Sequence, residues 1–168
     1  VNQAYEGARA LETEPVELAP IPASEDKISV PLENDFRGIP VTEKKSLAQE
    51  YNDILLRFDP QIVDTHTAYF DTFTRLVFAN SEGTYIEEER PMVNIAFSAV
   101  ARKDGNVQRA FEAVSKVAGF DAVSGHQELA QAVARRAVDL LTAPPVKGGR
   151  FPVVCNPKMA GVFAHEAF

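Results

Sequence analysis

Residues 92–117 read MVNIAFSAVARKDGNVQRAFEAVSKV. The stretch contains two runs rich in apolar and β-branched residues, Met92–Arg102 and Asn106–Val117, on either side of Lys103-Asp104-Gly105. Asp-Gly between two such runs indicates a β-hairpin, because a tight turn needs positive φ at its central positions and these residue types tolerate it. We therefore expect two antiparallel strands here.

The chain before this hairpin has the same character. Ile62–Phe70 and Thr72–Phe78 are rich in β-branched and aromatic residues, and Thr84–Glu88 follows a turn that reads Asn-Ser-Glu-Gly at residues 80–83. Such runs, separated by turn residues, predict strands. Four or five strands in succession, with helices before and after them, predict an α+β fold with an antiparallel, curved sheet.

Helical patterns flank the strands. Residues 2–12 predict a short helix, and residues 43–58 predict an amphipathic helix that Thr42 caps and Pro60 ends. Residues 126–142 give the clearest helical pattern. Its predicted buried stripe is Leu129, Val133, Ala137, Leu140 and Leu141.

Residues 13–42 predict an extended connector, with a short strand at Lys27–Val30. A long helix is excluded there because proline removes a backbone donor and clashes with the preceding turn. The prolines of this segment are Pro15, Pro20, Pro22, Pro31 and Pro40.

A change of composition near residue 145 predicts a domain boundary. Pro144-Pro145 ends the last long helical pattern, and Gly148-Gly149 adds a flexible link. We expect residues 1–145 to form the α+β module and residues 146–168 to begin a second domain.

The second domain would begin with a buried strand at Phe151–Cys155. Asn156 would then cap a helix with Pro157 at its first position. From Met159 onward this helix is apolar or small except at His165 and Glu166, so we expect it to be buried on most faces.

Charge and composition narrow the classes of function. The net charge is −7 and no basic stripe is present, which argues against a duplex-DNA interface. One cysteine cannot form an internal disulfide, which favours a cytoplasmic protein. No apolar run is long enough to span a membrane, and the first residues lack the features of a signal peptide.

The adjacent pair His165-Glu166 carries the most specific chemistry. On a helix, a neutral histidine can bind a metal ion while the next carboxylate acts as a general base toward water. A dipeptide alone is weak evidence, and the alternative interpretation is a His-Glu pair satisfied by hydrogen bonds near the surface.

The surrounding stretch, DLLTAPPVKGGRFPVVCNPKMAGVFAHEAF at residues 139–168, resembles the TldD/PmbA family of peptide-maturation zinc metallopeptidases. The family has a Pro-Val-Val strand, a turn and a helix that reads Gly, three apolar residues, then His-Glu-Ala. The turn at residues 80–83 and the hairpin at Asp104-Gly105 also resemble that family's middle segment. The chain is thus similar to an internal piece of such a protein, interrupted within its metal motif.

The resemblance implies roles for two residues. His165 would be the first zinc ligand and Glu166 the general base for hydrolysis of peptides or unfolded protein segments. The second histidine would lie two positions beyond Phe168, and a cysteine ligand far downstream. That histidine spacing differs from the i, i+4 spacing that puts both ligands on one helix face. We therefore expect residues 1–168 alone to bind zinc weakly and to lack activity.

The resemblance also implies a cytoplasmic dimer, either a homodimer or a heterodimer with a paralogous subunit. The family includes subunits without the metal motif, so a non-catalytic scaffold or peptide-binding module is the alternative function. Binding to gyrase or nucleic acid, which the older family name of gyrase modulator suggests, is disfavoured by the acidic charge.

Three further residues could be taken for metal ligands. We expect Cys155 to be a small buried hydrophobic residue at the end of its strand. We expect His66 to lie on a strand surface, facing the same way as Asp64 and Ala68, and His126 to lie at a helix N-terminus.

Overall fold

A computed structural model describes residues 2–11 and 20–168 and confirms the α+β class. Residues 12–19, which include the start of the predicted connector and Pro15, lie outside the described residues. The elements in chain order are α1 (Asn2–Leu11), β1 (Glu25–Ile28), η1 (Phe36–Gly38), α2 (Val41–Leu56), β2 (Ile62–Ala79), β3 (Tyr85–Lys103), β4 (Asn106–Lys116), η2 (Phe120–Val123), α3 (Gln127–Leu140) and α4 (Pro157–Ala167).

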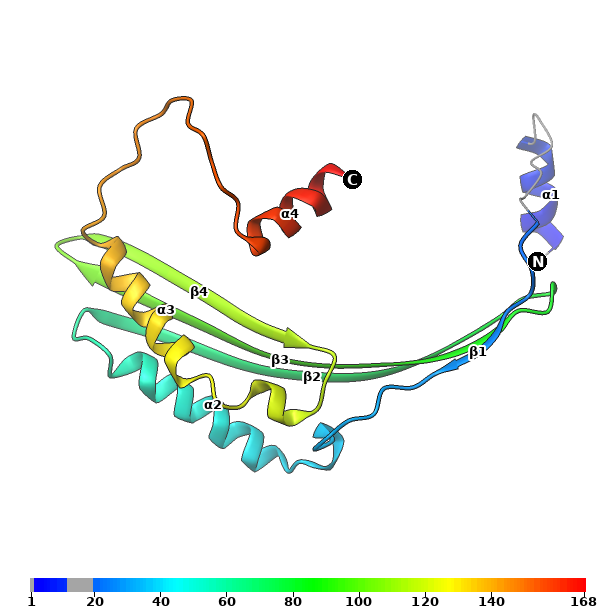
Figure 1. The fold of residues 1–168 in the computed structure, drawn as a ribbon, viewed down its shortest axis with the longest axis horizontal. Coiled ribbons are helices and arrows are strands. Elements are labelled where there is room, and N and C mark those ends of the chain that lie inside the picture. The colour runs from blue at the N-terminus through cyan, green and yellow to red at the C-terminus, as the bar shows by residue number, and fades with distance from the viewer. Residues whose placement is uncertain (1, 12–19) are drawn as a thin grey trace.

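The sheet is built around β3, which pairs along both of its edges. β2 lies antiparallel to it on one edge, while β4, antiparallel, and β1, parallel, occupy successive stretches of the other. The sheet is therefore mixed, because the parallel pairing of Glu25–Ile28 adds to the predicted antiparallel strands. The four strands form one long, curved ribbon (Figure 1).

The predicted strand breaks at residue 71 and at residues 89–91 do not exist. β2 is one strand of 18 residues and β3 one of 19. Pro91 lies where β3 has no partner on one edge, between the stretches paired with β1 and β4. A strand tolerates proline best where a ladder hydrogen bond is not required.

Both predicted turns are confirmed. Asp104 and Gly105 have φ of 48° and 83°, and they join Lys103 to its cross-strand partner Asn106. At the other hairpin, the Asn80 carboxamide oxygen accepts hydrogen bonds from the backbone N–H of Glu82 and of Thr84, at 3.1 and 2.9 Å.

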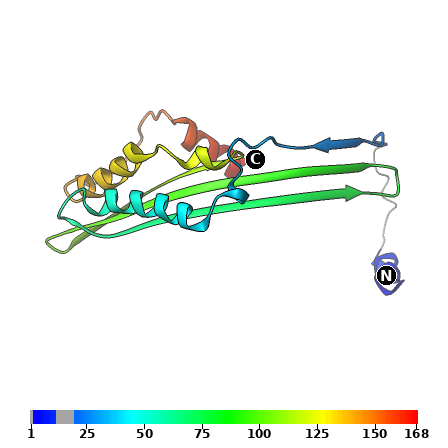
Figure 2. The ribbon, with the colours of Figure 1, turned by 90° about the horizontal axis from the view of Figure 1, so that it is seen from below.

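Helices α2 and α3 pack against one face of the sheet (Figure 2), and we call the opposite face, on which neither of them lies, the open face. Alternate residues of β3 point toward the helices because side chains alternate across a strand. The covered set is fully buried and consists of Val93, Ile95, Phe97, Ala99 and Ala101. On the open face, Phe70 of β2 and Phe111 of β4 are about half exposed.

The helix α2 packs through an apolar stripe, as its predicted amphipathic pattern implies, and Tyr51 and Leu55 of this stripe are fully buried. Its N-cap is Pro40, which makes no side-chain hydrogen bond, so the predicted cap at Thr42 is wrong. Thr42 instead lies within the first turn, and its carbonyl oxygen accepts a hydrogen bond from the Ser46 hydroxyl at 2.9 Å.

The buried stripe of α3 is rotated from the predicted one. Val133 and Ala137 are buried as expected, but Leu140 is 37% exposed and two alanines, Ala130 and Ala134, complete the buried face. Small residues bring a helix close to the sheet, and the larger leucines then lie at the margin of the contact. Leucine was therefore a poor guide to the centre of this interface.

Tyr51 connects the sheet, α2 and the start of α3. Its ring meets Phe97 edge-on, with centroids 5.2 Å apart. Its hydroxyl donates to the Val123 carbonyl oxygen at 2.9 Å and accepts from the backbone N–H of His126 at 3.1 Å. Burial raises the pKa of the Tyr51 hydroxyl, so it stays protonated and able to donate.

Replacing Tyr51 with Phe should lower the free energy of unfolding by about 1–3 kcal/mol, because it leaves a carbonyl and an N–H without their partner in the interior. Urea denaturation with an unchanged slope would measure the loss. The matched control is Tyr85→Phe, since Tyr85 is 41% exposed and donates to Glu87 at the surface. Equal unfolding midpoints for the two variants would contradict this role of Tyr51.

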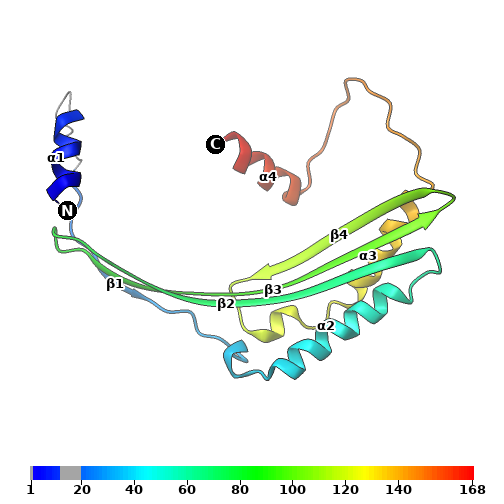
Figure 3. The same ribbon diagram turned by 180° about the vertical axis from the view of Figure 1, so that it is seen from behind.

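The far end of the β2–β3 hairpin extends beyond α2 and α3, as the view from behind shows (Figure 3). We call residues 74–90 the hairpin arm, and none of them is buried. Ion pairs such as Arg75–Glu87, at 2.5 Å, and Arg90–Glu88, at 2.6 Å, lie along it. None of the helices described at residues 2–11 and 20–168 combines the length and apolar character needed to cross a bilayer.

Candidate functional site

The helix α4 begins as the sequence predicts. The Asn156 side-chain oxygen accepts a hydrogen bond from the Met159 backbone N–H at 2.8 Å, and Pro157 occupies the first helical position. This cap satisfies one of the donors that a helix leaves unpaired at its start, and proline has no N–H to satisfy.

The predicted strand at Phe151–Cys155 is wrong. These residues run without strand pairing and are exposed, and Cys155 is an exposed thiol rather than a buried residue. Their continuous run of apolar residues suits a buried strand, but a strand also needs a neighbouring edge to pair with. In the described part of the chain, residues 151–155 pair with no strand, although the outer edge of β2 is free.

The prediction that α4 is buried on most faces is also wrong. Every residue from Phe151 to Phe168 is exposed, and Phe163 is 65% exposed. His165 and Glu166 lie on this helix near its C-terminal end and are exposed as well. The apolar side chains of α4 therefore present a surface that a further structural element could cover.

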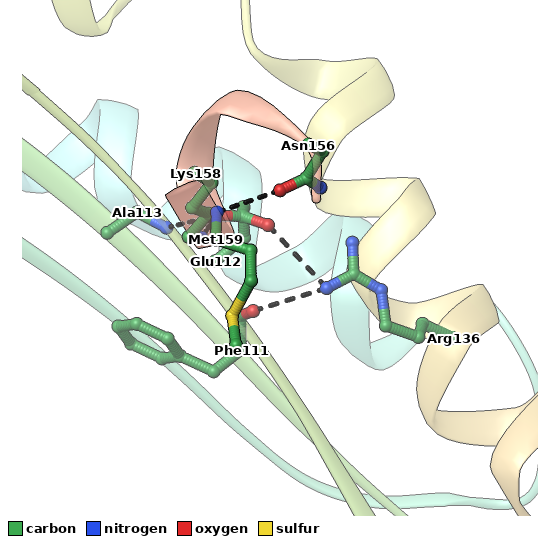
Figure 4. Close-up of polar contacts among 7 residues, drawn as sticks. All are labelled: Phe111, Glu112, Ala113, Arg136, Asn156, Lys158 and Met159. Carbon is green, nitrogen blue, oxygen red and sulfur yellow. Dashed lines mark hydrogen bonds and ion pairs between the residues drawn. The ribbon is translucent and has the colours of Figure 1, made fainter. Parts of the chain in front are cut away.

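The start of α4 is attached to the sheet and to α3 by a junction of charged side chains (Figure 4). The Lys158 ammonium donates a hydrogen bond to Glu112 Oε1 of β4. The Arg136 guanidinium of α3 lies 3.5 Å from Glu112 Oε2 and donates to the Phe111 carbonyl oxygen at the same distance. We call Glu112, Arg136 and Lys158 the Glu112 junction.

The electrostatics of the junction favour an ionised Glu112. The hydrogen bond from Lys158 lowers the pKa of the Glu112 carboxyl, while burial opposes that effect and Arg136 reinforces it. The Glu112 side chain is 19% exposed, compared with 68% for Lys158 and 49% for Arg136. A half-buried anion thus holds two more exposed cations.

The described residues do not form a complete zinc site. Structural zinc has four protein ligands and catalytic zinc usually three, chosen from His, Cys, Asp and Glu. His165 is suited to be one of them, but residues 2–11 and 20–168 contain no group of three such side chains able to hold a metal ion. His165 could therefore hold zinc only as one member of a larger ligand set.

The other histidines lie away from α4. His66 is exposed on β2, opposite Ser98, which confirms the predicted surface position. His126 is the N-cap residue of α3, and its Nε2 lies 3.1 Å from the Ala122 carbonyl oxygen.

Comparison with known proteins assigns this chain to a family. The family model described as the central domain of PmbA/TldA metallopeptidases matches residues 34–142, which run from the segment before η1 through the end of α3. The chain belongs to the PmbA/TldD family.

Relatives in the PmbA/TldD family carry protease names. A metalloprotease from Synechocystis is 34% identical over 169 residues, covering 100% of this chain and 36% of that protein. A zinc metalloprotease TldD homolog from Saccharolobus solfataricus is 24% identical and covers 92% of this chain and 34% of that protein. The chain thus spans about a third of the length of these relatives.

A solved structure shows the same fold. A Thermotoga maritima protein, described as a candidate modulator of a DNA gyrase, superposes with a TM-score of 0.64 at 16% identity. The match covers 88% of this chain and 34% of that one. The PmbA/TldD fold therefore includes the long curved sheet with helices on one face.

Sequence patterns alone missed the Glu112 junction. Lys158 and Glu112 are 46 positions apart, so no local spacing connects them. One signal was available: Lys158 lies in the first turn of a helix, where the macrodipole disfavours a cation. A lysine in that position suggests an acidic partner elsewhere in the fold.

Proposed function

We propose that this chain is part of a zinc-dependent metallopeptidase, with His165 as a metal ligand and Glu166 as the general base. The observation that carries the proposal is the His165-Glu166 pair on an exposed helix, in a family whose relatives are named metalloproteases. Both side chains are exposed, so a metal ion and an incoming peptide can reach them.

A bound zinc ion would supply Lewis acidity and make water more acidic. The residues of this chain would have roles separate from the Lewis acidity of the metal. His165 would present a neutral imidazole nitrogen. Glu166, about 100° further around the helix, would hold a carboxylate beside it. That carboxylate accepts a proton from water and can later return it to the leaving amine.

The proposed substrates are peptides or unfolded protein segments. An extended chain can bind by adding to an open sheet edge, where main-chain hydrogen bonds give affinity. In the described residues, the outer edge of β2 has no partner strand over Ile62–Ala79. An extended peptide has its backbone N–H and C=O groups available to pair with such an edge, whereas most of those of a folded protein are already paired.

Association with a second subunit is a further proposal, either a homodimer or a heterodimer with a paralogous chain. Its support is the exposed apolar surface of α4, where Val162 and Phe163 are more than half exposed. The alternative function, a non-catalytic scaffold or peptide-binding module, would need no metal and no base. The presence of both His165 and Glu166 favours the catalytic function.

The test is zinc binding by the complete protein. We expect about one zinc per chain by elemental analysis and hydrolysis of an unstructured peptide. His165→Ala should weaken zinc binding at least about 100-fold, since loss of an outer partner of a ligand already weakens it about 10–100-fold. The matched control is His66→Ala, an exposed histidine on β2. Zinc binding that is equally strong in both variants would refute His165 as a ligand.

A further inference from the structure

The Glu112 junction is the polar attachment of α4 to the rest of the described fold. Lys158 in the first turn of α4 reaches Glu112 on β4, and Arg136 of α3 contacts the same carboxylate. The remaining residues of α4 are exposed and do not pack on the sheet. The junction therefore determines how the start of this helix meets the sheet.

Helix geometry connects the junction to His165. Lys158 and His165 are seven residues apart in α4, which is about two helical turns, so their side chains leave the helix on nearly the same side. The rise between them is about 10 Å. If Lys158 is directed toward Glu112, the direction of His165 is determined as well.

We infer that Glu112, together with Arg136, is a positioning residue that sets the rotation of α4 through Lys158 and so directs His165 toward its metal. This inference rests on the proposed function of His165. Glu112 would then affect the metal site without contacting the metal, because its effect passes through Lys158 and α4.

The exposure of Lys158 fits a positioning role of the Glu112 junction better than a stabilising one. Lys158 is 68% exposed, and ion pairs between such exposed groups add little to stability. Catalytic and ligand geometry is far more sensitive, because a misplacement of about 1 Å can lower activity about 100-fold. The expected effect of breaking the junction is therefore on zinc binding and turnover rather than on folding.

The experiment compares lysine substitutions in the complete protein. Lys158→Met should weaken zinc binding about 10–100-fold, measured by competition with a chromophoric chelator, as loss of outer partners of metal ligands does. It should lower kcat by a similar factor with little change in KM, and leave the thermal unfolding temperature unchanged. Lys158→Arg should restore most of the zinc affinity, because it keeps the positive charge facing Glu112.

The chain offers a closely matched control in Lys27→Met. Lys27 is 74% exposed and pairs with Glu87, which is 18% exposed, so the burial of this pair resembles that of Lys158 with Glu112. It lies on β1, away from α4. Lys27→Met should leave zinc affinity and kcat unchanged.

A second variant, Glu112→Gln, approaches the junction from the other side. It should weaken zinc binding as Lys158→Met does, and combining the two should add little, because both remove one interaction. The inference is overturned if Lys158→Met and Lys27→Met bind zinc equally well, or if the effects of Glu112→Gln and Lys158→Met simply add. A wild-type protein without zinc and without hydrolysis would instead refute the proposed function, and the inference with it.

Discussion

Replacing Glu166 with Gln is expected to abolish peptide hydrolysis by the complete protein while leaving zinc bound. Glutamine has nearly the same shape as glutamate, so the helix and His165 should be unaffected. Its amide oxygen is too weak a base to take a proton from water. Loss of a general base typically lowers the rate about 10²–10⁴-fold, and we expect kcat to fall within that range.

Two measurements make this test specific. Zinc content by elemental analysis should match that of the wild-type protein, which separates a missing base from a missing metal. Glu82→Gln serves as the control for the same chemical change, since Glu82 lies in the exposed turn between β2 and β3. If Glu166→Gln retained full activity, another group would have to act as the base, and our assignment would be wrong.

The largest effect on stability is expected from Phe97→Ala. Phe97 is fully buried at the centre of β3 and contacts the ring of Tyr51 edge-on. Truncating it would remove a large apolar side chain and leave a cavity between the sheet and α2. Substitutions of this kind lower the free energy of unfolding by about 3–5 kcal/mol.

Phe70→Ala provides the comparison for Phe97→Ala. Phe70 is on β2, on the open face of the sheet, and 55% exposed, so its loss should change the stability by no more than about 0.5 kcal/mol. Both variants can be compared by urea denaturation of the same chain. A large loss for Phe70→Ala would show instead that the open face is packed against another part of the protein.

Local patterns predicted the elements of the fold well where the signal lay within a few residues. Residues within one or two turns of each other encode the Asp104-Gly105 turn, the Asn80 turn and the apolar stripe of α2. The parallel pairing of β1 with β3 was not, because Glu25 and its partner Tyr85 are 60 positions apart. Nothing in the polar sequence of β1 specifies that partner.

The candidate site was predictable in part for the same reason. The Asn156 cap and the Pro157 start follow from local rules, and the structure confirms them. The exposure of Phe151–Cys155 and of α4 could not be inferred. The buried fraction of a segment depends on what packs against it as well as on its own hydrophobicity. The roles of His165 and Glu166 remain predictions that the experiments above would test.

The hairpin arm and the helix-covered part of the sheet should differ in how easily their strand hydrogen bonds open. Near Phe97 the strands are covered by α2 and α3, so their hydrogen bonds should open only when the whole core unfolds. Beyond Pro91 the same two strands have no buried side chain, and exposed ion pairs weaken with ionic strength. The hairpin arm is therefore the part of the sheet whose hydrogen bonds should open first, while those of the helix-covered end should stay closed.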